Sequence, residues 1–174
     1  MNKDIIYTYQ NKLITTKKDI EESIKTFNGT FLEKEYIANN ILELIKLSDS
    51  FSNNQYTRCK DILNKAIYVL FKFKGNDFDI KDLYNLITNP GGHGRMIINK
   101  FLRLPSKTEE EQKENLDVAT FFLNDFFEKE NKNKKESNIY TKDVILLSYY
   151  LNELIEVNSK IEKPIDNSID DDII

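Results

Sequence analysis

Glycine and proline, the residues that interrupt regular backbone structure, are scarce in this chain, with five glycines and three prolines among 174 residues. Between them the apolar residues recur at spacings of three and four, which is the period of one face of an α-helix. The sequence therefore predicts an all-α fold. Its 40% apolar content, with eleven Phe and nine Tyr, is sufficient for the core of a single domain.

The apolar period and the stop signals together predict about eight helices in a bundle. We expect them over residues 4–14, 20–27, 31–47, 56–73, 80–87, 96–104, 109–127 and 141–155. Asp79 and Thr108 are expected to cap two of these helices, and SDSFSNN, residues 48–54, either interrupts the third or continues it. Residues 96–104 are apolar nearly all round, so they are expected to form a central buried helix. We expect one domain over residues 1–163 and a flexible acidic tail over residues 164–174.

Chemistry that needs clustered functional groups finds little support in the sequence. His93 and Cys59 are the only histidine and cysteine, and 34 positions separate them, which gives neither a metal-ligand set nor a nucleophile–base pattern. Neither an enzyme nor a cofactor is expected, and Cys59 is interpreted as a small buried apolar residue in a reducing compartment. Interspersed acidic and basic residues with a net charge of -4 disfavour nucleic-acid binding. No segment approaches the ~18 to 20 apolar residues needed to cross a bilayer, so a soluble protein is expected.

The stretch NPGGHGRMIINKF, residues 89–101, holds three of the five glycines and the single histidine. Arg95 stands where a helix begins, directly after Gly94. An arginine at the edge of an apolar groove, preceded by glycines that allow a close approach, is typical of a site that holds an amphipathic helix. On spacing alone the simpler interpretation of Arg95, a surface side chain at a helix start, is preferred.

The same stretch is similar to a motif of the Bcl-2 family of apoptosis regulators. GGHGRMIINKF resembles the family's first homology motif, in which Asn-Trp-Gly-Arg opens the central helix. Gly94 and Arg95 match that motif, whereas Gly92 and His93 stand in place of its asparagine and tryptophan. The departure removes a hydrogen-bonding side chain and a packing anchor, which implies a narrow or altered range of partners.

Three further segments resemble Bcl-2 motifs, in the family's order and over about 150 residues. LIKLSDSF, residues 44–51, resembles the third motif, with Ser48 in place of the usual glycine and Asp49 retained. Residues 119–150, which include LND at 123–125, resemble the helix and second-motif region. NKDIIYTYQNKL, residues 2–13, is similar to the fourth motif. Four weak matches in the right order are much stronger than any one of them.

The resemblance implies about eight helices around a buried central one, with a groove for the BH3 helix of pro-apoptotic proteins such as Bax, Bak and Bim-like proteins. Arg95 would pair with the aspartate of that helix, and Gly94 would permit close helix approach. The other groove residues that the resemblance implies are Phe51, Tyr56, Cys59, Leu63, Leu83, Leu86, Ile87, Leu102 and either Tyr149 or Tyr150. For each apolar residue of this set, core packing is the alternative interpretation.

The resulting hypothesis is an anti-apoptotic protein, of a divergence typical of viral homologues, that sequesters death-promoting helices. An adaptor of the same fold that blocks innate-immune signalling through a surface face is the first alternative. A pore-forming family member is the second. Family members commonly carry a carboxyl-terminal membrane anchor, so a cytoplasmic protein at the host's mitochondrial outer membrane is expected if an anchor belongs to the full-length chain.

Overall fold

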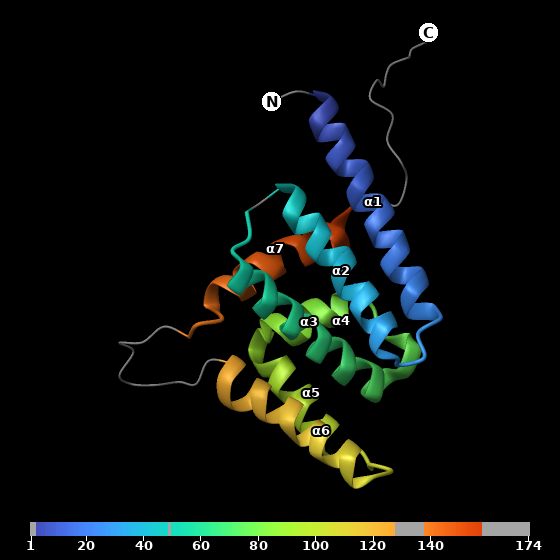
Figure 1. The fold of residues 1–174 in the computed structure, drawn as a ribbon, viewed down its shortest axis with the longest axis vertical. Coiled ribbons are helices and arrows are strands. Elements are labelled where there is room, and N and C mark those ends of the chain that lie inside the picture. Colours follow the sequence, from blue (N-terminus) through green and yellow to red (C-terminus); the bar gives the residue numbers. More distant parts are fainter. Residues whose placement is uncertain (1–2, 49, 128–137, 158–174) are drawn as a thin grey trace.

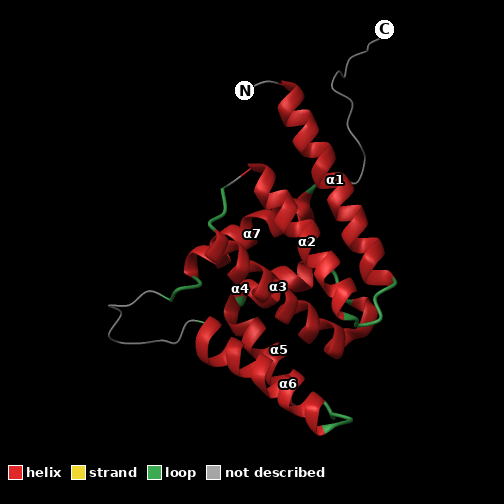
Figure 2. Cartoon of the chain, in the orientation of Figure 1, coloured by secondary structure: helices red, strands yellow, loops and turns green. Residues whose placement is uncertain are grey.

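The structure is a computed structural model that describes residues 3–48, 50–127 and 138–157. These residues form helices and loops without any strand (Figure 2). The helices are α1 (Lys3–Lys25), α2 (Phe31–Ser48), α3 (Asn53–Lys74), α4 (Ile80–Thr88), α5 (His93–Leu102), α6 (Glu109–Thr120) and α7 (Thr141–Glu156). Short 3-10 turns, η1 (Gly75–Asp77) and η2 (Pro90–Gly92), precede α4 and α5, and a π-helical segment, η3 (Phe121–Phe126), follows α6. The all-α prediction is thus confirmed.

The first helix differs from the prediction of two separate helices. α1 runs without a break from Lys3 to Lys25, and its amino-terminal half extends past the other helices (Figure 1). The polar stretch between the two predicted helices contains neither glycine nor proline, so no residue there ends the helix. Thr15 instead donates its hydroxyl to the carbonyl of Asn11 one turn earlier, and Thr16 is buried.

The core runs through the middle of the bundle, and α2 and α3 each contribute more buried residues to it than any other helix. α3 places seven apolar residues out of solvent: Cys59, Ile62, Leu63, Ala66, Ile67, Val69 and Leu70. Ser52 caps α3 by accepting a hydrogen bond from the backbone N–H of Gln55, and residues 50–52 lie outside the helices, so the segment 48–54 contains an interruption; Asp49 lies outside the described residues. A polar cap directly after α2 therefore turns the chain back against it.

The expectation that residues 96–104 form an enclosed central helix is wrong in part. Gly94, Ile97, Ile98 and Phe101 are buried on one side of α5, but Met96 and Leu102 are 43% and 40% exposed. α5 therefore has an outer face, and α3 is the more deeply enclosed helix. α5 packs against α4 and against α6 at one end of the molecule (Figure 1).

The apolar spacing of residues 109–127 predicts an inner face of Leu116, Ala119, Phe122, Leu123, Phe126 and Phe127, and Leu116 is the member that the structure contradicts. Leu116 is 55% exposed, whereas Asn115 and Val118 are buried. Asn115 tolerates burial because its side-chain oxygen accepts a 2.5 Å hydrogen bond from the Tyr68 hydroxyl. After Thr120 the backbone widens into the π-helical segment, which a pattern of period 3.6 does not reveal.

Candidate partner-binding site

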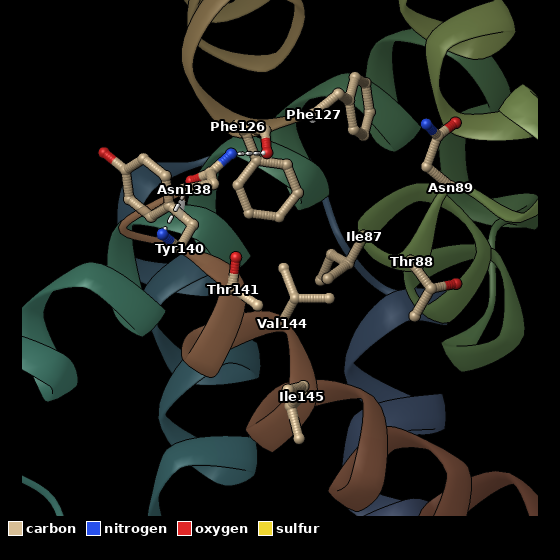
Figure 3. A pocket seen from close by; sticks show the side chains of 10 residues that line it. All are labelled: Ile87, Thr88, Asn89, Phe126, Phe127, Asn138, Tyr140, Thr141, Val144 and Ile145. Atoms are coloured by element: carbon tan, nitrogen blue, oxygen red, sulfur yellow. Dashed lines mark hydrogen bonds between the residues drawn. The ribbon is translucent and has the colours of Figure 1, made fainter. Parts of the chain in front are cut away.

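A pocket of about 360 Å³ opens where three elements meet: the end of α4, the end of η3 and the first turns of α7 (Figure 3). Its lining residues are Ile87, Thr88, Asn89, Phe126, Phe127, Asn138, Tyr140, Thr141, Val144 and Ile145. Most of these side chains are aliphatic or aromatic, so the pocket suits apolar groups. The volume is near the lower end of the ~300 to 1,000 Å³ typical of ligand pockets. It accommodates one or two large side chains.

The aromatic wall of the pocket results from the π-helical segment. The Phe127 N–H donates to the Phe122 carbonyl five residues earlier, at 2.9 Å, and this wider turn brings Phe126 and Phe127 to the same side. Their ring centroids lie 5.6 Å apart, and Phe126 lies 5.7 Å from Tyr140. Such tilted ring pairs add stability beyond the area that they bury. The wall is therefore part of a packed aromatic cluster.

Asn138 connects the two chain segments that border the pocket. Its side-chain NH₂ donates to the carbonyls of Phe126 at 2.9 Å and Asp125 at 3.2 Å, and its side-chain oxygen accepts from the Tyr140 N–H at 2.8 Å. Burial raises the pKa of the Tyr140 phenol, and the nearby carboxylate of Asp125 raises it further. One polar atom of the wall is unsatisfied among the described residues, since the buried hydroxyl oxygen of Thr141 has no hydrogen-bond partner there.

We call Asn89 and Arg95 the polar rim of the pocket: Asn89 lines it, and Arg95, which does not, contacts the lining residues Asn89 and Phe127. Asn89 ends α4 in the left-handed conformation, at φ 53°, and its side-chain oxygen accepts a 2.9 Å hydrogen bond from the Arg95 N–H. The half-buried Arg95 side chain places its guanidinium carbon 5.6 Å from the centroid of the Phe127 ring. No carboxylate of the described segments lies within ion-pair distance of Arg95. Within the described residues, the rim thus presents a cation that is held over an aromatic face.

Gly94 allows α5 to start against the end of α4. A Cβ atom at this position would lie 2.5 Å from the Leu86 carbonyl oxygen and 2.9 Å from the Phe127 ring, closer than non-bonded atoms approach. The close approach that the sequence assigned to Gly94 is therefore present, but it joins two helices of this chain.

The remaining residues implied by the Bcl-2 resemblance do not line one open groove in this structure. Cys59, Leu63, Leu83 and Leu86 are buried core residues, and Ile87 alone of the predicted set lines the pocket. Phe51 and Tyr56 are half-buried and pack on each other, with ring centroids 5.7 Å apart. Leu102 and Tyr149 are exposed, whereas Tyr150 is buried. Core packing, the alternative interpretation, therefore describes Cys59, Leu63, Leu83 and Leu86.

Several lining residues were not predicted, although the sequence contained a signal for some of them. The run FFLNDFF, residues 121–127, places four phenylalanines within seven positions. A regular helix would distribute them around three sides, so such density indicates a local departure from helical geometry. Asn138 and Tyr140 lie outside any periodic segment, and only the fold brings them to the pocket.

Comparison with known proteins gives no match: no family model, no curated protein and no solved structure is similar to this chain. The resemblance to the Bcl-2 family accordingly has no support beyond the four sequence segments. Within the described ranges, no helix is long and apolar enough to span a membrane, and no three histidine, cysteine or acidic residues are grouped to hold a metal ion.

Proposed function

We propose that this chain is an anti-apoptotic, Bcl-2-like protein that binds the BH3 helix of pro-apoptotic partners and thereby inhibits host cell death. The observation that supports the proposal is Arg95 at the rim of an apolar pocket, with no ion-pair partner among the residues that the structure describes. Its position at the start of α5, directly after a glycine packed on α4, is the one that the sequence motif implies.

The chemistry of the rim and pocket favours an amphipathic helix that carries a carboxylate. Arginine pairs with carboxylates through two parallel hydrogen bonds, which fixes the register of the bound helix. One apolar side chain of that helix would enter the pocket beside Ile87 and Val144. Further apolar anchors of the helix need space that the present conformation fills with core residues.

A second candidate function has one observation in its favour. Because Cys59, Leu63, Leu83 and Leu86 are buried, the structure also suits an adaptor of the same fold that acts through its outer surface. Such an adaptor would bind its partner without opening the core. Its partner binding would not depend on Arg95.

Fluorescence anisotropy with labelled BH3 peptides from Bax, Bak and Bim tests the first function. We expect at least one dissociation constant below about 10 µM, or ~7 kcal/mol of binding free energy. The variant Arg95→Asp should weaken that binding by about 2 to 5 kcal/mol, because it places a like charge opposite the peptide aspartate. Its melting temperature should change little, because the lost contact with Phe127 contributes only ~0.5 to 1 kcal/mol.

Arg103→Asp is the matched control, since it makes the same charge change at an exposed arginine that follows α5. It should leave the affinity within about threefold of the wild-type value. A peptide whose aspartate is replaced by arginine should in turn recover binding to Arg95→Asp. Absence of binding across the peptide panel contradicts the proposal, and equal weakening by the two charge reversals contradicts the role of Arg95.

A further inference from the structure

A bound amphipathic helix needs more apolar surface than the pocket offers. Such helices are held through anchors at positions i, i+3 or i+4, and i+7, whereas the pocket admits one or two side chains. The apolar side chains that could receive the others, Cys59 and Leu63 on α3 and Leu83 and Leu86 on α4, are at most 1% exposed. α7 packs along α4 and also contacts α3. Capture of a helix therefore requires α7 to move.

One buried ion pair ties the first turn of α7 to α3. The Arg58 Nε donates to one carboxylate oxygen of Asp143 at 2.7 Å, and its NH2 group donates to the other oxygen at 3.2 Å. Asp143 is fully buried, whereas the Arg58 side chain is 34% exposed. The two-point contact raises the pKa of the Arg58 guanidinium, so Arg58 remains charged under any physiological condition.

The pair lies next to the pocket without lining it. Asp143 lies between Thr141 and Val144 in the first turn of α7, and these two residues line the pocket. The contact of Asp143 with α3 therefore determines where this side of the pocket lies. Cys59, beside Arg58 on α3, is buried against the same contact. Burial raises the pKa of the Cys59 thiol to about 12, and the charge of Asp143 contributes to the increase.

The two partners of the ion pair differ in their exposure to water, since Asp143 is fully buried and Arg58 is partly exposed. Removing one partner of a buried ion pair leaves an uncompensated charge, which strongly favours any conformation that returns this charge to water. Here the group left behind would be the Asp143 carboxylate, and water reaches it when the first turn of α7 separates from α3. Water already reaches the partly exposed Arg58, so Arg58 is solvated without any movement of α7.

We propose that Arg58 and Asp143 form a latch that positions the first turn of α7, and that its release uncovers the α3 surface on which a partner helix is bound. The latch concerns the same site as the proposed function and rests on it. Arg58 acts as a positioning residue, because its contact with Asp143 sets the equilibrium between the closed conformation and an open one.

Cys59 provides a direct test, because it is the single cysteine of the chain and is fully buried in the closed conformation. Its alkylation by iodoacetamide under native conditions reports how often α7 separates from α3. In Arg58→Met we expect alkylation to be faster by on the order of 100-fold. The increase should show little dependence on low urea concentrations, since a local opening exposes much less surface than global unfolding.

Two further variants separate the latch from a general loss of stability. Arg58→Met combined with Asp143→Leu removes both charges, so Cys59 should regain most of its protection. Lys60→Met removes a neighbouring ion pair, 2.9 Å from Lys60 to Glu35, that ties α3 to α2 and leaves α7 untouched. This matched control should alter alkylation by no more than about fivefold. Should Arg58→Met fail to fold, Asp143→Asn serves in its place, with a smaller increase expected.

Peptide binding supplies the second measurement. If the open conformation is the one that binds, Arg58→Met should tighten BH3-peptide binding by the same factor by which it accelerates alkylation. Unchanged alkylation in Arg58→Met, or an increase with the urea dependence of global unfolding, overturns the latch. Accelerated alkylation without peptide binding to any variant supports the latch and contradicts the proposed function. Peptide binding to the wild type, together with unchanged alkylation in Arg58→Met, supports the proposed function and contradicts the latch.

Discussion

Gly94 sets the distance between two helices by the absence of one methyl group. Its backbone is ordinary helix, so the glycine is not required by a positive φ. It is required because the Leu86 carbonyl and the Phe127 ring occupy the space of a Cβ. The same contact brings Arg95, one position later, to the rim of the pocket. A residue with no side chain thus positions the cation assigned to partner binding.

This contact predicts an unusual sign for a glycine-to-alanine change in a helix. Alanine normally stabilises a helix relative to glycine by ~1 kcal/mol. We expect Gly94→Ala to lower the free energy of unfolding by about 1 to 3 kcal/mol instead, because the backbone of α4 has to shift. Urea unfolding followed by circular dichroism measures the change. Asn99→Ala, at an exposed position of α5, is the control and should leave the free energy of unfolding unchanged or slightly raised. An unchanged or raised free energy of unfolding in Gly94→Ala would refute the close contact.

Sequence reasoning found this pair of residues but not what surrounds it. The Gly-Arg motif identifies Gly94 and Arg95, and both lie against Phe127, which lines the pocket. The Asn-Pro-Gly-Gly run at residues 89–92 predicts a helix stop, but it does not reveal that Asn89 adopts the left-handed conformation and accepts a hydrogen bond from the Arg95 N–H. A local sequence pattern identifies residues such as Gly94 and Arg95, whereas the residues that they contact depend on the fold of the whole chain.

At the scale of the elements, helix ends were predicted better than helix faces. Asp79 begins α4 with a complete capping box: its side chain accepts from the Asp82 N–H at 2.8 Å, and the Asp82 side chain accepts from the Asp79 N–H at 3.0 Å. Ser52 and Thr108 cap α3 and α6 in a similar way. These signals depend on four consecutive residues, so the sequence reveals them directly.

Asp79→Ala should destabilise the protein by about 1 kcal/mol, because two backbone N–H groups of the first turn of α4 lose their partners or orientation. Asp79→Asn keeps an accepting oxygen and should cost less than half of that value. Thermal unfolding of the three proteins under identical conditions gives the comparison. Equal effects of alanine and asparagine would show that the negative charge, and not the cap hydrogen bond, is what matters.

The buried faces of the helices, and whether a helix continues through a polar stretch, are harder to predict from the sequence. The polar run inside α1 suggests a break, but the helix continues through it, with Thr16 buried and Lys17 bonded to the end of α7. The inner face of α6 shifted because a buried Asn115 is satisfied by Tyr68, 47 positions away. The π-helical segment then changed the period once more. The pocket depends on this segment, so its location could not follow from a helical pattern.

On the scale of the whole molecule, every α-helix contributes to one continuous apolar core in the described part of the chain. Few charges enter it, and several groups that can ionise at high pH are kept neutral there. Burial raises the pKa of Cys59 to about 12, and it also raises the pKa values of Tyr68 and Tyr140. Their protonation therefore links the packing of the core to the pH of the solution.

The protein should lose stability as the pH rises above 9. Below the usual cysteine pKa of 9.0, folded and unfolded chains both hold the Cys59 proton, and the stabilisation is complete. Between pH 9 and 12 only the unfolded chain releases it, so unfolding becomes easier by up to about 1.4 kcal/mol per pH unit. Urea unfolding at pH 8 and 9.8 should show this slope, and Cys59→Ala should reduce it. Parallel pH profiles for the two proteins would show that Cys59 is not the cause.

Lys17 connects the beginning of the bundle to its end. Its ammonium group donates to the carbonyls of Ile155 at 3.2 Å and Val157 at 3.4 Å, where α7 finishes. During translation this lysine leaves the ribosome long before the residues that it caps. A nascent chain can consequently dock α1 on α2 but not yet on α7. A protein truncated before α7 would leave part of its core exposed to chaperones and proteases.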